Sequence, residues 1–232
     1  MLQMTKDFVF HTIQGEGKYV GVPSVFIRLS GCNMRCKWLN SDGSVTLCDT
    51  PYSSHHPEKD MKSLAEILQA VDRYNTEHVV ISGGEPFLQE ELPQLVQDLK
   101  KKQKFITIET NATIYQETQA DFISMSPKLN SSMHQVEKAF QLPVSQEVIA
   151  KFIQSEADWQ LKFVVNQRED VEEIAEICRQ LGVEKNIFLM PQAIRKQELE
   201  ERSQWVAELA RERGWQYADR LHIRLWGAKR AK

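Results

Sequence analysis

The sequence predicts an α/β fold, a partial and open TIM-like barrel of about six parallel strands with crossover helices. Short apolar runs alternate with amphipathic segments from residue 22 to residue 213, as in chains of parallel strands joined by helices. About six strands are too few to close an eight-stranded barrel, so the sheet is expected to stay open. No repeat or linker divides the 232 residues, so residues 1–232 are expected to form one domain.

The strands are expected where the sequence is rich in apolar, β-branched and aromatic residues. These runs are 22–29, 78–82, 104–109, 121–126, 160–166, 186–191 and 221–226. Helical periodicity covers roughly 60–74, 89–102, 145–156, 168–182 and 194–213. Gly182 and Gly214 follow two of these segments and are typical helix stops. The link from 110 to 121 is too short for a crossover helix, so the alternation is expected to fail there.

Composition excludes several classes of protein. Hydrophobic residues make up 41% of the chain and charged residues 26%, which is ordinary for a globular protein. The net charge of -3 gives no reason to expect a nucleic-acid partner. No apolar run approaches the roughly 20 residues that span a bilayer, and the first residues lack the apolar core of a signal peptide. We therefore expect a cytoplasmic protein with no membrane contact.

Polar and glycine-rich residues follow the expected strands. Ser82 to Pro86 follow the second strand, residues 109–111 the third, residues 126–128 the fourth and residues 191–192 the sixth. Because the carboxyl ends of parallel strands lie at one rim of such a sheet, ligands collect there. The sequence therefore predicts a binding site on this rim.

Three of the four cysteines lie in the loop after the first strand, residues 31–50. In a reducing compartment, such thiols favour a metal or catalytic role over disulfides. Three thiolates can hold an iron–sulfur cluster with one open iron. They can also form a structural zinc site with His55 or His56, as in a zinc-stabilised binding module. Cys178 lies on an apolar helical period and is expected in the core.

The cysteines and the glycine turn together resemble the radical S-adenosylmethionine (SAM) superfamily. The residues that carry this resemblance are Cys32, Cys36, Cys48 and the segment Gly83-Gly84-Glu85-Pro86. More narrowly, the chain is similar to the 7-carboxy-7-deazaguanine synthase family almost from end to end. The similar segments are TIQGEGKYVGVPSVFIRLSGCNMRC (12–36), CDT (48–50), SGGEP (82–86), ETNAT (109–113), SPK (126–128) and LHIRLWGAKR (221–230).

This resemblance implies a [4Fe-4S] cluster on Cys32, Cys36 and Cys48, whose open iron is chelated by SAM. It places SAM against a further set of residues from the rim: Gly84, Glu85, Asn111, Ser126, Pro127, Lys128, Met190, Pro191, Gln192 and Ala193. Within that set, a side chain at Gly84 is expected to obstruct SAM. Thr50 matches the family's Mg²⁺ ligand, and a hard cation with few protein ligands is typical of magnesium.

The implied substrate is 6-carboxy-5,6,7,8-tetrahydropterin, and the implied product is 7-carboxy-7-deazaguanine, a precursor of queuosine, formed by a lyase-type loss of ammonia. Arg28 is expected to pair with the substrate carboxylate through its planar fork. The other residues implied in substrate binding are Ile13, Gln14, Gly15, Glu16, Ser82 and His222. The resemblance also implies a flavodoxin- or ferredoxin-type electron donor and a homodimer.

The departure from the family pattern is the gap between Cys36 and Cys48. The usual gap is shorter, with an aromatic residue just before the last cysteine. Here Trp38 stands at the expected distance from Cys36, but an insert precedes Cys48 and leaves Leu47 as its neighbour. Either Trp38 or Leu47 is expected to contact the adenine of SAM. A different radical SAM enzyme, such as a glycyl-radical activating enzyme, is the alternative function; the QGEG segment (14–17) and Thr50 argue against it.

Overall fold

A curved nine-stranded sheet forms the centre of the protein, whose computed structural model describes residues 1–232. The strand order across the sheet is β11-β10-β9-β8-β7-β6-β2-β1-β5. The strands are β1 (Leu2–Ile13), β2 (Pro23–Leu29), β5 (Asp60–Lys62), β6 (His78–Ser82), β7 (Phe105–Thr110), β8 (Phe122–Met125), β9 (Asp158–Val165), β10 (Ile187–Pro191) and β11 (Gln216–Tyr217). A separate two-stranded hairpin joins β3 (Lys37–Leu39) and β4 (Val45–Leu47).

The strands β2, β6, β7, β8, β9, β10 and β11 are parallel, as the sequence predicts, and the sheet does not close. Two antiparallel strands extend one edge beyond the prediction: β1 pairs with β2, and β5 pairs with β1. No helix lies between β7 and β8, so the alternation does fail where the link is short. The open, partial barrel is confirmed.

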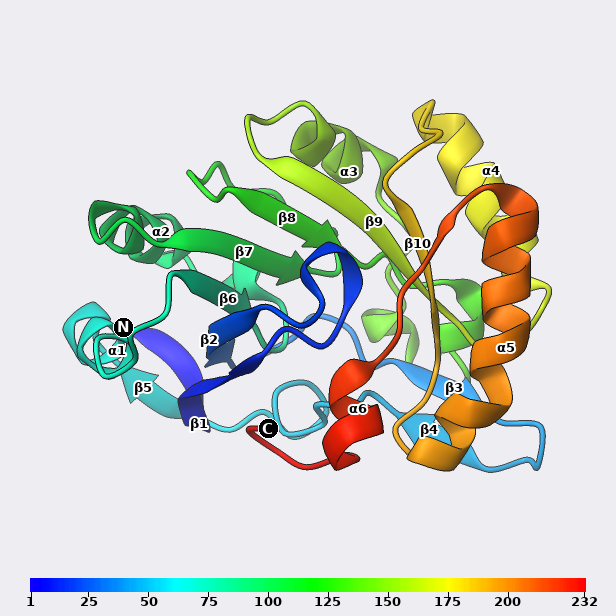
Figure 1. Ribbon diagram of the computed structural model, residues 1–232, viewed down its shortest axis with the longest axis horizontal. Helices are drawn as coiled ribbons and strands as arrows, with labels where there is room; N and C mark the ends of the chain where they lie inside the picture. The colour runs from blue at the N-terminus through cyan, green and yellow to red at the C-terminus, as the bar shows by residue number, and fades with distance from the viewer.

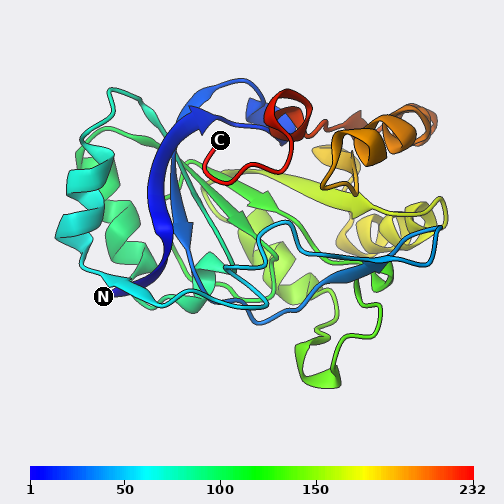
Figure 2. The same ribbon diagram turned by 90° about the horizontal axis from the view of Figure 1, so that it is seen from below.

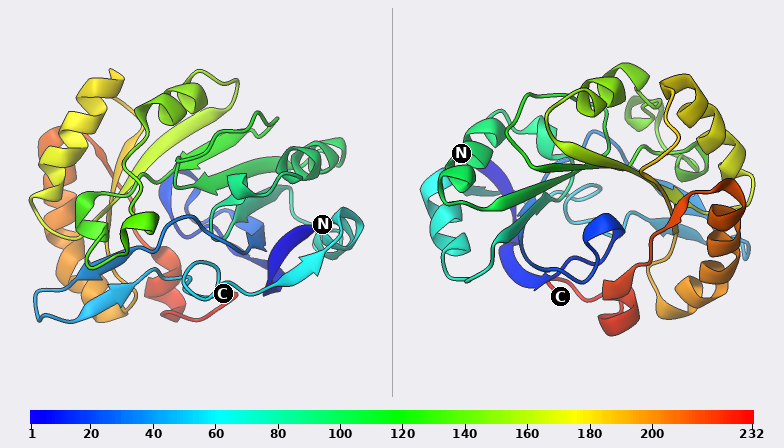
Figure 3. Two further views of the ribbon diagram at one scale, coloured as in Figure 1. Left: turned by 180° about the vertical axis from the view of Figure 1, so that it is seen from behind. Right: turned by 45° about the horizontal axis from the view of Figure 1, so that its top comes forward.

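Five helices lie around the outside of the curved sheet (Figures 1 and 3). They are α1 (Leu64–Val71), α2 (Leu92–Lys101), α3 (Gln146–Ile153), α4 (Asp170–Leu181) and α5 (Lys196–Arg213). Short 3-10 turns lie at Gly17–Tyr19, Pro86–Leu88, Asn130–Ser132 and Lys138–Phe140. Helix α1 begins with a capping box formed by Ser63 and Glu66. Helices α4 and α5 end at Gly182 and Gly214, whose φ angles of 67° and 68° are left-handed.

The core lies between the sheet and these helices and comprises 34 buried hydrophobic residues. It includes Cys178 of α4, which is 4% exposed, so the prediction that this thiol packs in the core is confirmed. Burial of this continuous apolar layer is the main stabilisation that the fold receives.

The segment 221–226 is a helix, α6 (Leu221–Trp226), and the prediction of a strand there is wrong. Its residues alternate as in a strand, but β11 already occupies the free edge of β10. Only Ile223 of the alternating apolar residues is buried, packed with Ala193 and Leu199, whereas Leu225 is 49% exposed. Residues 221–226 join no strand of the sheet, and their backbone satisfies its hydrogen bonds locally as a helix.

Loops cover the open side of the barrel. Figure 1 shows α6 and the C-terminal tail between β1 and α5, and Figure 2 shows the loop that carries the cysteines running along the same side. The hairpin β3–β4 reaches the end of the sheet near α5, where Arg202 donates to Asn40 Oδ1 at 3.0 Å. None of the helices has the length and apolar character that crossing a bilayer requires.

The core position of Cys178 gives a first prediction. We expect Cys178→Ala to lower the free energy of unfolding by about 1 kcal/mol through lost packing, and Cys178→Ser to cost more because a buried hydroxyl lacks a partner. Neither substitution should change the iron bound on anaerobic reconstitution, whereas Cys32→Ser should lower it. Denaturant unfolding and iron analysis measure these effects. Loss of iron from Cys178→Ala would contradict the assignment.

Candidate active site

One cavity at the carboxyl ends of the parallel strands collects most of the predicted site residues. All four predicted metal ligands and all seven predicted substrate residues line it. Of the predicted SAM residues, those lining it are Trp38, Leu47, Gly84, Asn111, Ser126, Lys128, Met190 and Gln192. Four others, Glu85, Pro127, Pro191 and Ala193, are buried behind its wall. The loops that follow the parallel strands therefore meet at one cavity, as the sequence predicts, although these four side chains do not line it.

The insert between Cys36 and Cys48 forms the hairpin β3–β4. Lys37 pairs with Leu47 at its base, and the Cys48 amide donates to the Cys36 carbonyl at 3.2 Å. Because the two ends of a hairpin lie side by side, the eleven residues between Cys36 and Cys48 do not separate the cysteines in space. All three thiols consequently face one cavity.

The three thiols fit a polynuclear cluster better than a single ion. A zinc ion whose four ligands lie about 2 Å away requires ligand atoms that are nearly in contact with one another. No three His, Cys, Asp or Glu side chains are arranged in that way. Neither His55 nor His56 lines the cavity. Burial raises the pKa of Cys32 to about 11 and that of Cys36 to about 12. Metal binding would have to displace these protons.

Neighbouring amides support the cysteine loop. The Met34 amide donates to Cys32 Sγ at 3.4 Å. The Asn111 side chain donates to Asn33 Oδ1 at 2.9 Å and lies 3.9 Å from Cys32 Sγ, and Asn33 in turn donates to Thr113 at 2.8 Å. Asn111 thus holds the cysteine loop against the end of β7, a contact that its sequence position did not suggest.

The glycine turn packs backbone against backbone with the cysteine loop. The Glu85 amide donates to the Gly31 carbonyl at 2.8 Å. A Cβ on Gly84 would lie 1.9 Å from the Gly31 oxygen and 2.7 Å from the Ser53 oxygen. Gly83, with φ of 140°, would place a Cβ 2.0 Å from the Leu29 oxygen. The sequence predicted that a side chain at Gly84 would obstruct SAM, and the structure adds an obstruction by the protein's own backbone.

The Glu85 side chain is fully buried and braces this turn. Its oxygens accept hydrogen bonds from the Phe87 amide at 3.0 Å, the Thr110 hydroxyl at 2.8 Å and the Asn111 amide at 2.7 Å. Burial raises its pKa to about 7 against the three hydrogen bonds, which favour the carboxylate. Only the backbone of Glu85 is therefore placed near the cavity.

Trp38 and Leu47 both line the cavity from the base of the hairpin. Trp38 is 5% exposed and packs with Met34 and Cys36, and its buried indole N–H has no hydrogen-bond partner. Across the cavity, Gln192 is held by Arg202 of α5, which donates to both its carbonyl and its side-chain oxygen. Since Arg202 also contacts Asn40 at 3.0 Å, the hairpin and the end of β10 are fixed to each other.

Arg28 is a half-buried arginine of the cavity wall that has no ion-pair partner. Its Nε is buried without a partner, and its side chain makes no ion pair. The guanidinium lies over the rings of Phe10 and Phe26, at 5.5 and 5.9 Å from their centroids. A buried donor without an acceptor is costly unless a ligand supplies one, so this position fits an incoming carboxylate.

The other predicted substrate residues form a connected polar wall. Ser82 and Gln14 both donate to the Glu109 carboxylate, at 2.7 and 3.1 Å. Helix α6 docks on the loop before β2, where the Leu221 amide donates to the Gly15 carbonyl at 2.9 Å. A Cβ on Gly15 would lie 2.2 Å from His222 Nδ1, so glycine is needed for this contact. Burial lowers the pKa of His222, which favours a neutral ring.

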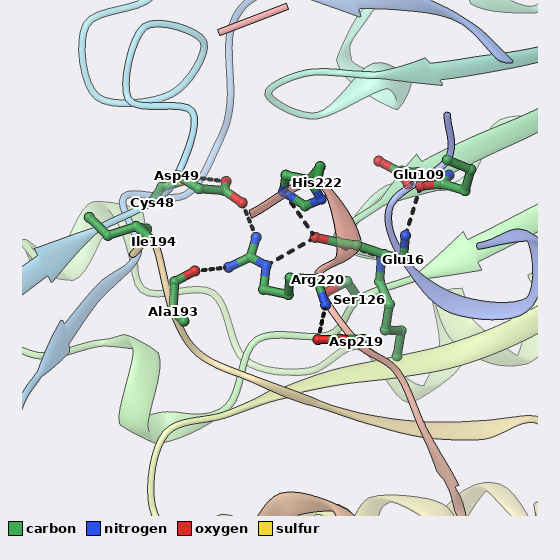
Figure 4. Close-up of polar contacts among 12 residues, drawn as sticks. Glu16, Cys48, Asp49, Glu109, Ser126, Ala193, Ile194, Asp219, Arg220 and His222 are labelled. Atoms are coloured by element: carbon green, nitrogen blue, oxygen red, sulfur yellow. Dashed lines mark hydrogen bonds and ion pairs between the residues drawn. The ribbon is translucent and has the colours of Figure 1, made fainter. Parts of the chain in front are cut away.

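Sequence reasoning missed a buried charge cluster beside these residues (Figure 4). Glu16 accepts from Lys162 at 2.5 Å and from Arg220 at 3.1 Å, and Arg220 also pairs with Asp49. Burial opposes charge on Glu16, yet the two cations outweigh it and lower the pKa of that carboxyl. Within this cluster the two cations balance the two carboxylates, and none of its carboxylates pairs with Arg28. A lysine inside the apolar strand run 160–166 was the available signal.

Thr50 faces the cavity directly after Cys48 and Asp49. Its hydroxyl lies 3.5 Å from Cys48 Sγ, and its carbonyl accepts from Ser53 and Ser54 at 2.9 and 3.0 Å. These bonds fix the backbone of Thr50, which lines the cavity beside Cys48. One hydroxyl beside a carboxylate is a donor set that suits Mg²⁺.

Comparisons with known proteins agree with this geometry. The sequence profile of the Radical SAM superfamily matches residues 26–206. The chain is 36% identical over 231 residues to the 7-carboxy-7-deazaguanine synthase of Rhodopirellula baltica, which covers 95% of this chain and 86% of that one. It is 35% identical to the protein of that name from Halobacterium salinarum, over 94% and 88% of the two chains. The crystal structure of QueE from Escherichia coli matches 95% of both chains with a TM-score of 0.69 and 26% identity.

Burial of the thiols predicts slow alkylation of the cluster-free protein. With pKa values of about 11 and 12, Cys32 and Cys36 should carry roughly 200-fold and 2,000-fold less thiolate at pH 8 than free cysteine does. We therefore expect iodoacetamide to label both slowly at pH 8, with rates still rising at pH 10, as followed by peptide mass spectrometry. Unfolding in urea should restore ordinary rates. A rate that levels off near pH 8.5 in the folded protein would refute the assignment.

Proposed function

The chain belongs to the radical SAM superfamily and, within it, to the 7-carboxy-7-deazaguanine synthase family, and from this membership we propose that it converts 6-carboxy-5,6,7,8-tetrahydropterin into 7-carboxy-7-deazaguanine with loss of ammonia. The observation that best supports the substrate is the unpaired Arg28 guanidinium in the cavity that three thiols line. A carboxylated heterocycle satisfies that guanidinium, and the thiols account for the cofactor. The whole chain, residues 1–232, acts as one radical SAM domain in this proposal.

Cys32, Cys36 and Cys48 would hold the [4Fe-4S] cluster. When bound, the reduced cluster and SAM supply a 5′-deoxyadenosyl radical, the species that removes hydrogen from C6 of the substrate. The protein's part is to position SAM and the substrate and to exclude water. Residues around Gly84, Ser126 and Lys128 would border SAM on one side, and Met190 and Gln192 on the other. Ile13 and Gln14 would border the pterin ring.

The substrate carboxylate would lie between Arg28 and Thr50. Arg28 offers two parallel donors, fixed in direction by the rings of Phe10 and Phe26. Thr50 would supply one ligand to Mg²⁺, and the remaining ligands would be water and substrate oxygens. The Glu109 carboxylate, held by Ser82 and Gln14, is placed to accept hydrogen bonds from N–H groups of a heterocycle. A buried, fixed acceptor of this kind orients a ligand without a reorganisation cost.

The pathway and partners follow from this proposal. The product is a precursor of deazapurines such as queuosine, and the cluster requires a one-electron donor of the flavodoxin or ferredoxin type. The homodimer and the cytoplasmic location stay predictions from the sequence.

Anaerobic reconstitution tests the proposed function directly. The protein should turn brown and bind about four irons per chain. With SAM, a reductant, Mg²⁺ and the carboxypterin, it should form a product with the mass of 7-carboxy-7-deazaguanine and release ammonia. A colourless protein that binds zinc would refute the radical chemistry. Cleavage of SAM without that product would keep the superfamily chemistry and refute the substrate.

Arg28 gives a second test, specific to the carboxylate. Arg28→Ala removes a charged hydrogen-bond donor pair worth about 1.5–3 kcal/mol, so we expect the KM for the carboxypterin to rise roughly 10- to 150-fold. Arg28→Lys should recover part of the loss, because lysine keeps the charge but lacks the fork.

The control for Arg28 is a ligand without the carboxylate. Tetrahydropterin lacking the 6-carboxyl group should inhibit the wild type and Arg28→Ala with similar inhibition constants. Equal losses for both ligands would show that Arg28 supports the cavity's shape and does not bind the carboxylate.

A further inference from the structure

Arg220 is a buried arginine whose three guanidinium nitrogens all donate hydrogen bonds. It is not among the residues predicted to bind the cluster, SAM, Mg²⁺ or the substrate. It lies in the loop between β11 and α6, and its side chain is 6% exposed. Its Nε donates to Glu16 at 3.1 Å, its Nη1 donates to the Ala193 carbonyl at 2.5 Å, and its Nη2 donates to Asp49. Figure 4 shows these three partners arranged around the guanidinium on different sides.

The three partners belong to three separate loops that line the cavity. Glu16 lies between β1 and β2, beside the residues proposed for the pterin. Asp49 lies between Cys48 and Thr50, the proposed cluster and Mg²⁺ ligands. Ala193 follows Gln192, which lines the proposed SAM side. They lie 204, 171 and 27 residues away from Arg220 in sequence, so the guanidinium joins parts of the chain that no local structure connects.

The contact with Glu16 is reinforced from the sheet. Lys162 of β9, 4% exposed, binds the other oxygen of the same carboxylate at 2.5 Å. Glu16 is therefore held between the central strand β9 and the loop that carries Arg220. By contrast, Asp49 is 38% exposed and has Arg220 as its only ion-pair partner. The position of the Cys48–Thr50 segment relative to the pterin loop thus depends on this one guanidinium.

We propose that Arg220 is a positioning residue that sets the distance between the pterin-binding loop and the cluster- and Mg²⁺-binding loop. The proposal rests on the proposed function, which assigns the ligands of these two loops. A hydrogen transfer between SAM and the substrate depends on how the two ligands are placed, and a shift of about 1 Å can cost roughly 100-fold in rate. Loss of the contacts of Arg220 with Glu16 and Asp49 should therefore uncouple SAM cleavage from turnover of the substrate.

The test compares Arg220→Lys with Arg224→Lys. Lysine keeps the charge of Arg220, but a single ammonium cannot reach three acceptors on different sides of a planar fork. Arg224 is the matched control, because it lies four residues further along, is partly buried and pairs with Asp219 and Ser203, which are outside the cavity.

For Arg220→Lys we expect unchanged iron content and a retained cooperative thermal transition. We also expect the KM for the carboxypterin and the Mg²⁺ concentration for half-maximal rate to rise about tenfold or more. Free 5′-deoxyadenosine should accumulate relative to product by a similar factor. Arg224→Lys should match the wild type in each measurement. An Arg220→Lys variant with wild-type coupling, or one that only loses stability and iron, would overturn the proposal.

A second readout does not depend on activity. In the cluster-free protein without ligands, Arg220→Lys should speed amide hydrogen exchange in residues 14–22 and 48–56, and Arg224→Lys should not. Unchanged hydrogen exchange in both segments would overturn the proposal that Arg220 positions the two loops. If the wild type fails to convert the carboxypterin, the proposed function is refuted, and this exchange result still decides the role of Arg220.

Discussion

Incomplete closure of the sheet is the constraint on which the rest of this structure depends. A parallel sheet that ended in an eight-stranded barrel would close itself by backbone hydrogen bonds. Here the strands run from β5 to β11 without closing, so the open side must be covered by loops and side chains. Three arginines provide long-range contacts there: Arg202 joins the hairpin to β10, Arg220 joins three cavity loops, and Arg230 joins the tail to Glu58 and Asp7. Arginine suits this role because its fork can bind several acceptors at once.

On the opposite side of the cavity, two loops pack backbone against backbone. Gly83 and Gly84 approach the carbonyls of Leu29 and Gly31 so closely that any side chain would collide with them. Glu85 then secures the turn by accepting three hydrogen bonds inside the core. One wall of the site is therefore rigid and backbone-built, whereas the other is assembled from charged side chains.

Sequence reasoning predicted the parallel strands, the outer helices and the common rim, because hydrophobic periodicity and turn glycines report local structure. It failed where the decisive contact is remote. The strand expected at 221–226 is a helix, because β11 (Gln216–Tyr217) is the strand that pairs with β10, which local alternation does not reveal. Strand β1 was missed because its exposed residues Lys6 and Asp7 interrupt the apolar pattern. Arg220 and Lys162 were missed because their partners lie far away in sequence, with Glu16 204 residues from Arg220.

The hairpin explains how the cysteine loop tolerates its long insert. In an antiparallel hairpin, added residues extend the strands and the tip, while the distance across the base stays that of one strand pair. The hydrogen bond from Cys48 to Cys36 is such a base contact, so the insert lengthens the loop without moving its third thiol. The added length is then free for another use. Its tip residue Asn40 reaches Arg202 and, through it, Gln192 on the far side of the cavity. An insertion that looks like an interruption of a metal motif therefore supplies part of the wall that the open barrel lacks.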